Sequence, residues 1–217
     1  MYTPINIKRS SKYGNNYWEV YSPKVKRNVR LFSDLEYENW ILIETNPKIV
    51  SFCEQPLEIK DSIDGKSKKS IFDMWILYDD EREEFQEVKY QSELNDINSR
   101  SSKQVAFQKE WCVRNGYDYA VKTDVEIRKN KVYLDTLKQI IGQVKNSTLI
   151  NNKDIENVFE VIKYNTISLN NLSKITNFSY SYIVNIISIL IYNGMCEISN
   201  KDIGICLETE VTFDVKI

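Results

Sequence analysis

Between residues 33 and 127, apolar and polar positions follow helical spacing in two stretches and form strand-like runs in four others. Leu35, Trp40 and Ile43 recur at helical spacing after Ser33, a good N-cap, which predicts a helix over residues 33–44. A second helix is expected over 93–115, closed by Asn115-Gly116. Mostly apolar runs predict strands at 49–59, 70–78, 84–90 and 117–127. Helix, strands, helix and strand in this order predict a small α/β or α+β domain with a mixed sheet.

A different pattern follows residue 150. Helical spacing covers residues 154–164, 168–176 and 179–194, and two short strands flank a turn at Asn200-Lys201-Asp202. Three helices and a β-hairpin are typical of a winged helix-turn-helix. Gly, Ser and Asn collect between residues 141 and 152, so we expect a boundary there. The predicted organisation is a basic N-terminal segment (1–32), a core (33–145) and a winged-helix domain (150–217).

Charge is distributed unevenly, although the formal net charge is only −2. Residues 1–32 hold seven Lys or Arg and one acid, with Tyr13, Tyr17 and Trp18 between them. Residues 154–217 hold four basic residues and eight acids. A basic segment with interleaved aromatic residues suits a phosphate backbone, whereas an acidic one does not. The two ends are therefore expected to have different partners.

Composition excludes several classes of chemistry. The chain has no histidine, which removes Ser-His-Asp hydrolysis, Cys-His proteolysis and His-ligated zinc. Four cysteines lie far apart and form no C-x-x-C pair, as in a cytosolic protein with reduced thiols. The most apolar segment, 182–192, is too short to span a bilayer. We therefore expect a cytosolic (cytoplasmic) protein with no membrane partner.

The stretch "FQEVKY" (85–90) puts an acid and an amine one residue apart in an apolar strand. Because side chains alternate faces, Glu87 and Lys89 would share a face with Phe85. Asp73 lies inside the preceding apolar strand, where an unpaired carboxylate is costly. Asp73 and Glu87 on adjacent strands would form an oxygen-rich site for Mg²⁺. The cation could activate water against a phosphodiester, and Lys89 could hold that water or stabilise phosphate charge.

Simpler interpretations stand beside this one. An isolated D…E-x-K pattern often marks surface charges or an ordinary ion pair. Glu36 is a third candidate carboxylate, but "SDLE" (33–36) also fits a capping box, with Ser33 at N-cap and Glu36 at N3. Both roles of Glu36 remain open from the residues alone.

Four motifs occur in a distinctive order: "SDLE" (33–36), "EQPL" (54–57), Asp73 in "IFDMW", and "QEVK" (86–89). This order resembles the TnsA family, the DNA-cutting subunits of heteromeric cut-and-paste transposons. The resemblance implies a restriction-endonuclease-like PD-(D/E)xK core followed by a winged-helix domain. The family often has Gln where Glu87 stands, and no Pro precedes Asp73 here.

The resemblance also assigns roles to residues and implies partners. Glu36, Asp73, Glu87 and Lys89 correspond to the family's catalytic positions, and Val88 would offer its backbone carbonyl to a metal. The implied activity is Mg²⁺-dependent endonuclease cleavage of one DNA strand at transposon ends, with Mn²⁺ as a substitute cation. The implied partners are double-stranded DNA, a transposase subunit that cuts the other strand, and an ATP-dependent regulator bound through the C-terminal domain.

Two alternative functions accompany this hypothesis. A restriction or junction-resolving nuclease could use the same core. A non-catalytic DNA-binding regulator would use the winged helix to bind DNA and the front domain as a scaffold, although the acidity of 154–217 argues against it. In either nuclease, the helix at 93–115 would flank the site, and Lys103 or Gln104 would line the cleft.

Overall fold

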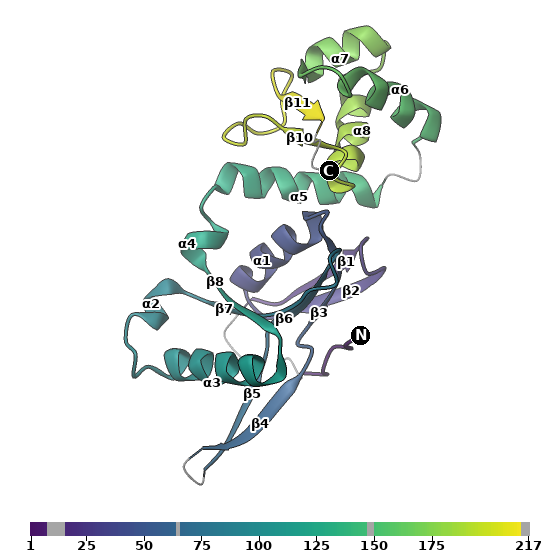
Figure 1. The fold of residues 1–217 in the computed structure, drawn as a ribbon. Helices are drawn as coiled ribbons and strands as arrows, with labels where there is room; N and C mark the ends of the chain where they lie inside the picture. Colours follow the sequence, from purple (N-terminus) through teal and green to yellow (C-terminus); the bar gives the residue numbers. More distant parts are fainter. Residues whose placement is uncertain (8–15, 64–65, 147–149, 214–217) are drawn as a thin grey trace. The chain divides into compact units, whose positions relative to one another are not determined.

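The computed structural model describes residues 1–7, 16–63, 66–146 and 150–213 (Figure 1). The chain forms two compact units: residues 1–43 with 48–129, and residues 44–47 with 130–217. Lys8, Arg9 and Lys12, three basic residues of the predicted N-terminal segment, lie outside the described residues, as does Tyr13. Each unit is described by itself below.

A four-stranded mixed sheet forms the centre of the first unit. Its strand order is β3-β6-β7-β8, with bounds Ile49–Glu54, Met74–Tyr78, Glu83–Lys89 and Asp118–Thr123. β3, β6 and β7 pair antiparallel, whereas β7 and β8 pair parallel. Parallel neighbours need a crossover, and helix α3 (Arg100–Asn115) supplies it after the short α2 (Gln91–Leu94). The expected mixed α/β architecture is confirmed for this unit.

Helices cover both faces of this sheet. On one face, Phe107 and Cys112 of α3 pack against Trp75 and Phe85. On the other, Leu35 of α1 (Asp34–Thr45) packs with Val88 and with Ile127 of α4 (Asp124–Ile127). Successive residues of β7 therefore alternate between the α3 face and the α1 face. This alternation sends Glu87 toward α3, on the same side as Phe85.

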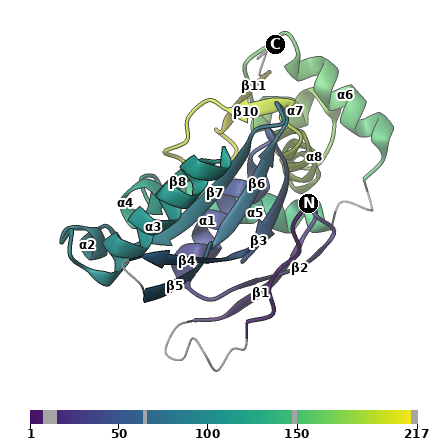
Figure 2. The same ribbon diagram turned by 60° about the horizontal axis from the view of Figure 1, so that its bottom comes forward.

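Two hairpins accompany the sheet. β1 (Trp18–Ser22) and β2 (Arg27–Leu31) pair antiparallel beside β3 (Figure 2). Arg27 joins them to β3 through a bidentate ion pair with buried Glu54, with N–O distances of 2.7 and 2.6 Å. β4 (Glu58–Ile63) and β5 (Lys66–Ile71) form the second hairpin, which projects from the sheet (Figure 1).

The strand predicted at 70–78 is two strands. β5 ends at Ile71, Phe72 and Asp73 lie between elements, and β6 begins at Met74. Residues 61–69, whose polar and glycine-containing sequence is typical of a turn, mostly belong to the β4–β5 hairpin. The sequence pattern missed this break because the apolar run continues through it, although the backbone changes hydrogen-bonding partners. Asp73 therefore lies just before β6, where its side chain can take the place of a backbone hydrogen-bond partner.

The second unit is mostly helical. It contains α5 (Lys131–Lys145), α6 (Asn152–Ile162), α7 (Leu169–Thr176) and α8 (Tyr180–Tyr192). A three-stranded sheet has the order β10-β11-β9, with bounds Cys196–Ile198, Glu210–Phe213 and Ile167–Ser168. α8 is the central helix, with seven buried residues between Ile183 and Ile191. α5 buries Leu134, Leu137, Ile140 and Ile141, so an apolar stripe of this helix belongs to the core of the second unit.

The division of the chain differs from the sequence expectation. It falls between Lys129 and Asn130, before α5, whereas the pattern of Gly, Ser and Asn placed it after residue 145. The reason is that the apolar stripe of α5 is buried in the core of the second unit. The local composition of the chain does not reveal which unit buries this stripe. The last strand also begins later than expected, at Glu210, because residues 201–209 form turns.

Within the described residues, no single helix is both long and apolar enough to cross a membrane. Taken together, α7 and α8, which are bent by 110° at the break between them, have the length and apolar composition of a membrane-spanning segment.

Candidate active site

One pocket of about 560 Å³ lies beside the start of β6 and the end of β7. Its lining includes Asp73, Glu87 and Lys89, three of the four predicted site residues. Gln104 and Lys103 of α3 line it too, as the sequence predicted for this helix. The fold thus brings the D…E-x-K residues to one concave surface.

Asp73 replaces a strand partner at the point where β6 begins. Its backbone N–H donates to the Gln86 carbonyl at 3.1 Å, and its Oδ2 accepts the backbone N–H of Val88 at 2.9 Å. The residue is 9% exposed. A buried carboxylate that accepts a backbone N–H is held in one place. This hydrogen bond anchors Asp73 to the end of β7.

The same hydrogen bond orients Val88. The N–H and C=O groups of a strand residue project to the same side, because each residue exchanges both bonds with one partner. The Val88 carbonyl therefore points to the side on which its N–H meets Asp73. A carboxylate and a carbonyl oxygen are presented together at this edge.

Glu87 is nearly inaccessible, with 1% exposure, and accepts three side-chain hydrogen bonds. Its Oε1 accepts from Lys89 Nζ at 2.7 Å and from Gln104 Nε2 at 2.8 Å. Its Oε2 accepts from Gln108 Nε2 at 2.8 Å. Burial, and then the charge of Asp73, raise the pKa of Glu87 from its ordinary value of 4.5 to about 8, against the lowering effect of Lys89 and Gln108.

Lys89 carries the positive charge nearest to these carboxylates. Burial alone would lower the pKa of Lys89, but the charges of Glu87 and Asp73 outweigh it and raise that pKa above its ordinary value. The ammonium group therefore stays protonated at neutral pH. It can donate hydrogen bonds to a water molecule or to an anion in the pocket.

Glu36 takes half of the predicted capping-box geometry in this structure: Ser33 caps its N–H, but its own carboxylate bonds to Phe32 and not to Ser33. Its backbone N–H donates to Ser33 Oγ at 3.1 Å, and its Oε2 accepts the N–H of Phe32 at 3.0 Å. Its carboxylate does not line the pocket, but Gln55, which does, donates to Glu36 Oε2 at 3.4 Å. The Gln55 N–H also donates to the Asp73 carbonyl at 3.0 Å. Glu36 is thus connected to the pocket through one intervening residue.

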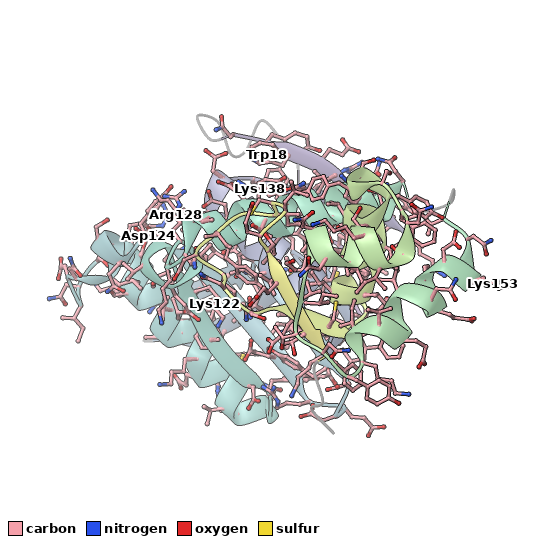
Figure 3. All side chains as sticks on the ribbon, turned by 90° about the horizontal axis from the view of Figure 1, so that it is seen from above. Trp18, Lys122, Asp124, Arg128, Lys138 and Lys153 are labelled. Atoms are coloured by element: carbon pink, nitrogen blue, oxygen red, sulfur yellow. The ribbon has the colours of Figure 1, made fainter. Side chains whose placement is uncertain are left out.

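Basic side chains surround the pocket. Lys68, Lys69, Arg100 and Lys103 line it and are exposed. Among the described residues, Lys68, Arg100 and Lys103 form no ion pair. Some other cations of the unit are paired: Lys122 with Glu126 at 2.8 Å and Arg128 with Glu38 at 2.7 Å. Lys122 and Arg128 are labelled in Figure 3. Three cations without an ion pair among the described residues, Lys68, Arg100 and Lys103, therefore lie at the pocket rim.

The donor atoms at the pocket suit a hard divalent cation. In the part of the chain that the structure describes, no three His, Cys, Asp or Glu side chains gather as metal ligands. Mg²⁺ commonly uses only one or two protein carboxylates and completes its shell with waters and substrate phosphate. Asp73 and Glu87 with the Val88 carbonyl fit that requirement. Burial is the main cause of the raised pKa of Glu87, and a cation would offset the second cause, the repulsion from Asp73.

Comparison with known proteins supports a nuclease. Residues 46–124 match the family described as TnsA-like endonuclease N terminal. This domain belongs to the TnsA-like endonuclease family. The matched segment of the TnsA-like domain contains Asp73, Glu87 and Lys89. It also contains all four strands of the mixed sheet in full. Glu36 lies before it. No curated protein matches the chain.

The family assignment agrees with the resemblance drawn from the sequence motifs, and an endonuclease of this family acts on DNA. Sequence reasoning missed Gln108, which contacts Glu87 directly. The available signal was its spacing: Gln108 follows Gln104 by four residues, so both face the same side of α3. A buried glutamine at that spacing becomes meaningful only when the facing strand is known.

Proposed function

We propose that this chain is a Mg²⁺-dependent DNA endonuclease that cleaves one strand at transposon ends as the nuclease subunit of a heteromeric transposase. The observation that carries the proposal is the convergence of Asp73, Glu87 and Lys89 in one pocket of a TnsA-like domain. Phosphodiester hydrolysis needs negative charge to be stabilised on phosphate, and this pocket combines carboxylates for a cation with a fixed ammonium group.

Asp73, Glu87 and the Val88 carbonyl would hold the cation. Bound there, Mg²⁺ supplies positive charge that polarises a phosphodiester and favours ionisation of the attacking water. The chain supplies the positioning: Asp73 is fixed by the Val88 N–H, and Glu87 by three side-chain donors. Fixed ligands avoid the entropic cost of ordering side chains during binding.

Lys89 would act on the substrate side of the pocket. Its ammonium group lies 2.7 Å from Glu87 Oε1, and 16% of the Lys89 side chain is exposed. It can therefore orient a water molecule or stabilise charge on a phosphate oxygen without leaving the carboxylate. Hydrolysis would form a bond from the water oxygen to phosphorus and break one bridging P–O bond. The proton of the attacking water would pass to solvent or to a pocket base, and the leaving sugar oxygen would take up a proton from solvent.

The rim cations support DNA as the substrate. Lys68 comes from the projecting β5 strand, and Arg100 and Lys103 come from the first turns of α3. Unpaired cations on both sides of a concave site can each take a phosphate of a duplex. The rim thus offers contacts for backbone phosphates on either side of the scissile bond.

The second unit supports a role in assembly, and we propose that it is a winged helix-turn-helix. α7 ends at Asn177 with a φ of +57°, Ser179 caps α8, and the two helices cross at 110°. This geometry matches helix-turn-helix pairs. α8 contains neither Lys nor Arg, so phosphate binding is not favoured there. Protein docking is the better use, with an ATP-dependent regulator as the proposed partner and the other-strand transposase as the second.

The test of this function is metal removal. The full chain, mixed with the transposase subunit and a duplex carrying a transposon end, should nick one strand in Mg²⁺. Chelation with EDTA should abolish nicking and Mn²⁺ should restore it, because the carboxylate pair needs a hard cation. Nicking that persists in EDTA would contradict the proposal. Equal cleavage of unrelated duplexes would favour a restriction-type nuclease instead.

Glu36→Gln separates capping from catalysis. Gln retains an oxygen for the Phe32 N–H, so the melting temperature should stay near that of the wild type. If Glu36 serves the cation through its charge, as the family resemblance implies, nicking should fall by about tenfold or more. Strand nicking and thermal melts measure the two effects. Full activity in this variant would leave Glu36 with the capping role alone.

A further inference from the structure

We propose that Gln108, held in place by Tyr119, is a positioning residue that fixes the Glu87 carboxylate for cation binding. This inference rests on the proposed nuclease function. Gln108 lies in α3 with no exposed surface and does not line the pocket. Its Nε2 donates to Glu87 Oε2 at 2.8 Å and to Ser70 Oγ at 2.9 Å. The glutamine thus approaches Glu87 from behind.

Tyr119 determines which end of the Gln108 amide faces Glu87. The phenol of Tyr119 donates to Gln108 Oε1 at 2.8 Å. Because the amide oxygen is engaged there, the NH₂ group must point to Glu87, which is the partner that a carboxylate can accept from. Burial raises the pKa of Tyr119, with further raising by the charges of Glu87 and Asp73, so the phenol remains a donor.

The fold fixes both members of this relay relative to β7. Tyr119 pairs with Phe85 across the parallel β7–β8 ladder, two residues before Glu87. The Tyr119 ring also packs in the aromatic cluster, 6.2 Å from the ring of Phe72. Gln108 follows Phe107, which packs in the same cluster from α3. The donor to Glu87 Oε2 is therefore attached to the rigid core of the first unit.

This arrangement divides the two Glu87 oxygens between two environments. Oε2 bonds to Gln108, outside the pocket lining, whereas Oε1 bonds to Lys89 and Gln104, which line the pocket. Holding Oε2 from behind restricts rotation of the carboxylate and keeps Oε1 toward the cavity. A neutral amide does this without adding positive charge that would compete with a cation.

Mn²⁺ binding to the full chain tests the proposal without relying on cleavage. Four variants are compared by electron paramagnetic resonance titration: Gln108→Met, Tyr119→Phe, the double variant, and Tyr2→Phe. Gln108→Met nearly preserves volume and removes both ends of the relay. Tyr2→Phe is the matched control, since the Tyr2 phenol belongs to the same aromatic cluster but donates to Tyr117.

Gln108→Met should weaken Mn²⁺ binding by about 10- to 100-fold, as removal of an outer-shell partner does. Tyr119→Phe should weaken it by a few-fold, and the double variant should equal Gln108→Met, because Tyr119 acts through Gln108. Tyr2→Phe should bind as the wild type does. Thermal melts confirm folding, and Tyr119→Phe still decides the matter if Gln108→Met does not fold.

If both single variants bind Mn²⁺ as tightly as the wild type does, the role of Gln108 is overturned. The nuclease proposal still stands in that case, provided that the wild-type chain binds Mn²⁺ and cleaves DNA. Additive losses in the double variant would overturn the relay from Tyr119. Absence of Mn²⁺ binding to the wild-type chain would instead overturn the nuclease proposal, and this inference with it.

Discussion

Asp73→Asn is expected to reduce nicking of transposon-end DNA by at least about 10²- to 10³-fold. Asn keeps an oxygen that accepts the Val88 N–H, so the junction between β6 and β7 is retained. The change removes one of the two carboxylate charges that would hold the cation. Activity should therefore be lost while the melting temperature, measured without metal, does not fall.

Asp73→Ala gives a different result in the same assay. It also abolishes nicking, but it leaves the buried Val88 N–H without its acceptor, which costs about 1–3 kcal/mol. Asp80→Asn, on the exposed β6–β7 turn, is the matched control and should keep wild-type activity. Substantial nicking by Asp73→Asn would contradict the assignment of Asp73 as a cation ligand.

The pH dependence of stability gives Asp73→Asn a second readout. Because the pKa of Glu87 is raised to about 8 in the folded chain, its contribution to stability is fully present below pH 4.5 and is lost as the pH rises through 8. Asp73→Asn removes one cause of that shift. Without metal, the melting temperature of the variant relative to the wild type should therefore increase from pH 5 to pH 8.

The sequence predicted the charged residues that line the pocket better than the residues that hold them in place. Asp73, Glu87 and Lys89 were identified because charged residues inside apolar runs are costly without a purpose, and the fold places all three at one pocket. A capping box was one of two open interpretations for Glu36, and the structure shows the bond to Ser33, whereas the Glu36 carboxylate accepts the N–H of Phe32 instead of that of Ser33. Its metal-linked role stays a prediction.

Features that depend on distant partners could not be predicted. The apolar run at 70–78 conceals the break at Asp73, because hydrophobicity does not report which backbone groups pair. The stripe of α5 is equally apolar whichever unit buries it, so composition placed the boundary after this helix. Gln108 has only its four-residue spacing from Gln104 as a local signal, since its role is defined by Glu87 and Tyr119 on two strands.

DNA affinity should depend on the pocket rim of the first unit. Replacing Lys68, Arg100 and Lys103 with Gln removes three exposed cations that have no ion-pair partner among the described residues. At about 1 kcal/mol per phosphate contact, duplex affinity should fall on the order of 100-fold. The slope of log affinity against log salt should become shallower by about 2.7, at about 0.9 per contact.

The matched control places the same charge change in the second unit. Lys145, Lys153 and Lys174, which likewise form no ion pair among the described residues, are replaced with Gln; Lys153 is labelled in Figure 3. Residues 130–217 hold eight basic and nine acidic residues once α5 is included, so this unit is closer to neutral than residues 154–217 alone. Its central helix α8 contains no Lys or Arg that could bind a phosphate group. This triple variant should therefore keep nearly the wild-type affinity and salt slope.

Fluorescence anisotropy of the full-length chain on a duplex, over a range of salt concentrations, measures both quantities for the two triple variants. Because both carry the same change in net charge, a general loss of attraction would affect them equally. A large loss confined to the rim variant supports DNA binding by the nuclease unit, leaving the second unit for protein partners. An equal or larger loss in the second-unit variant would show that the second unit binds DNA, and the proposed division of roles would be wrong.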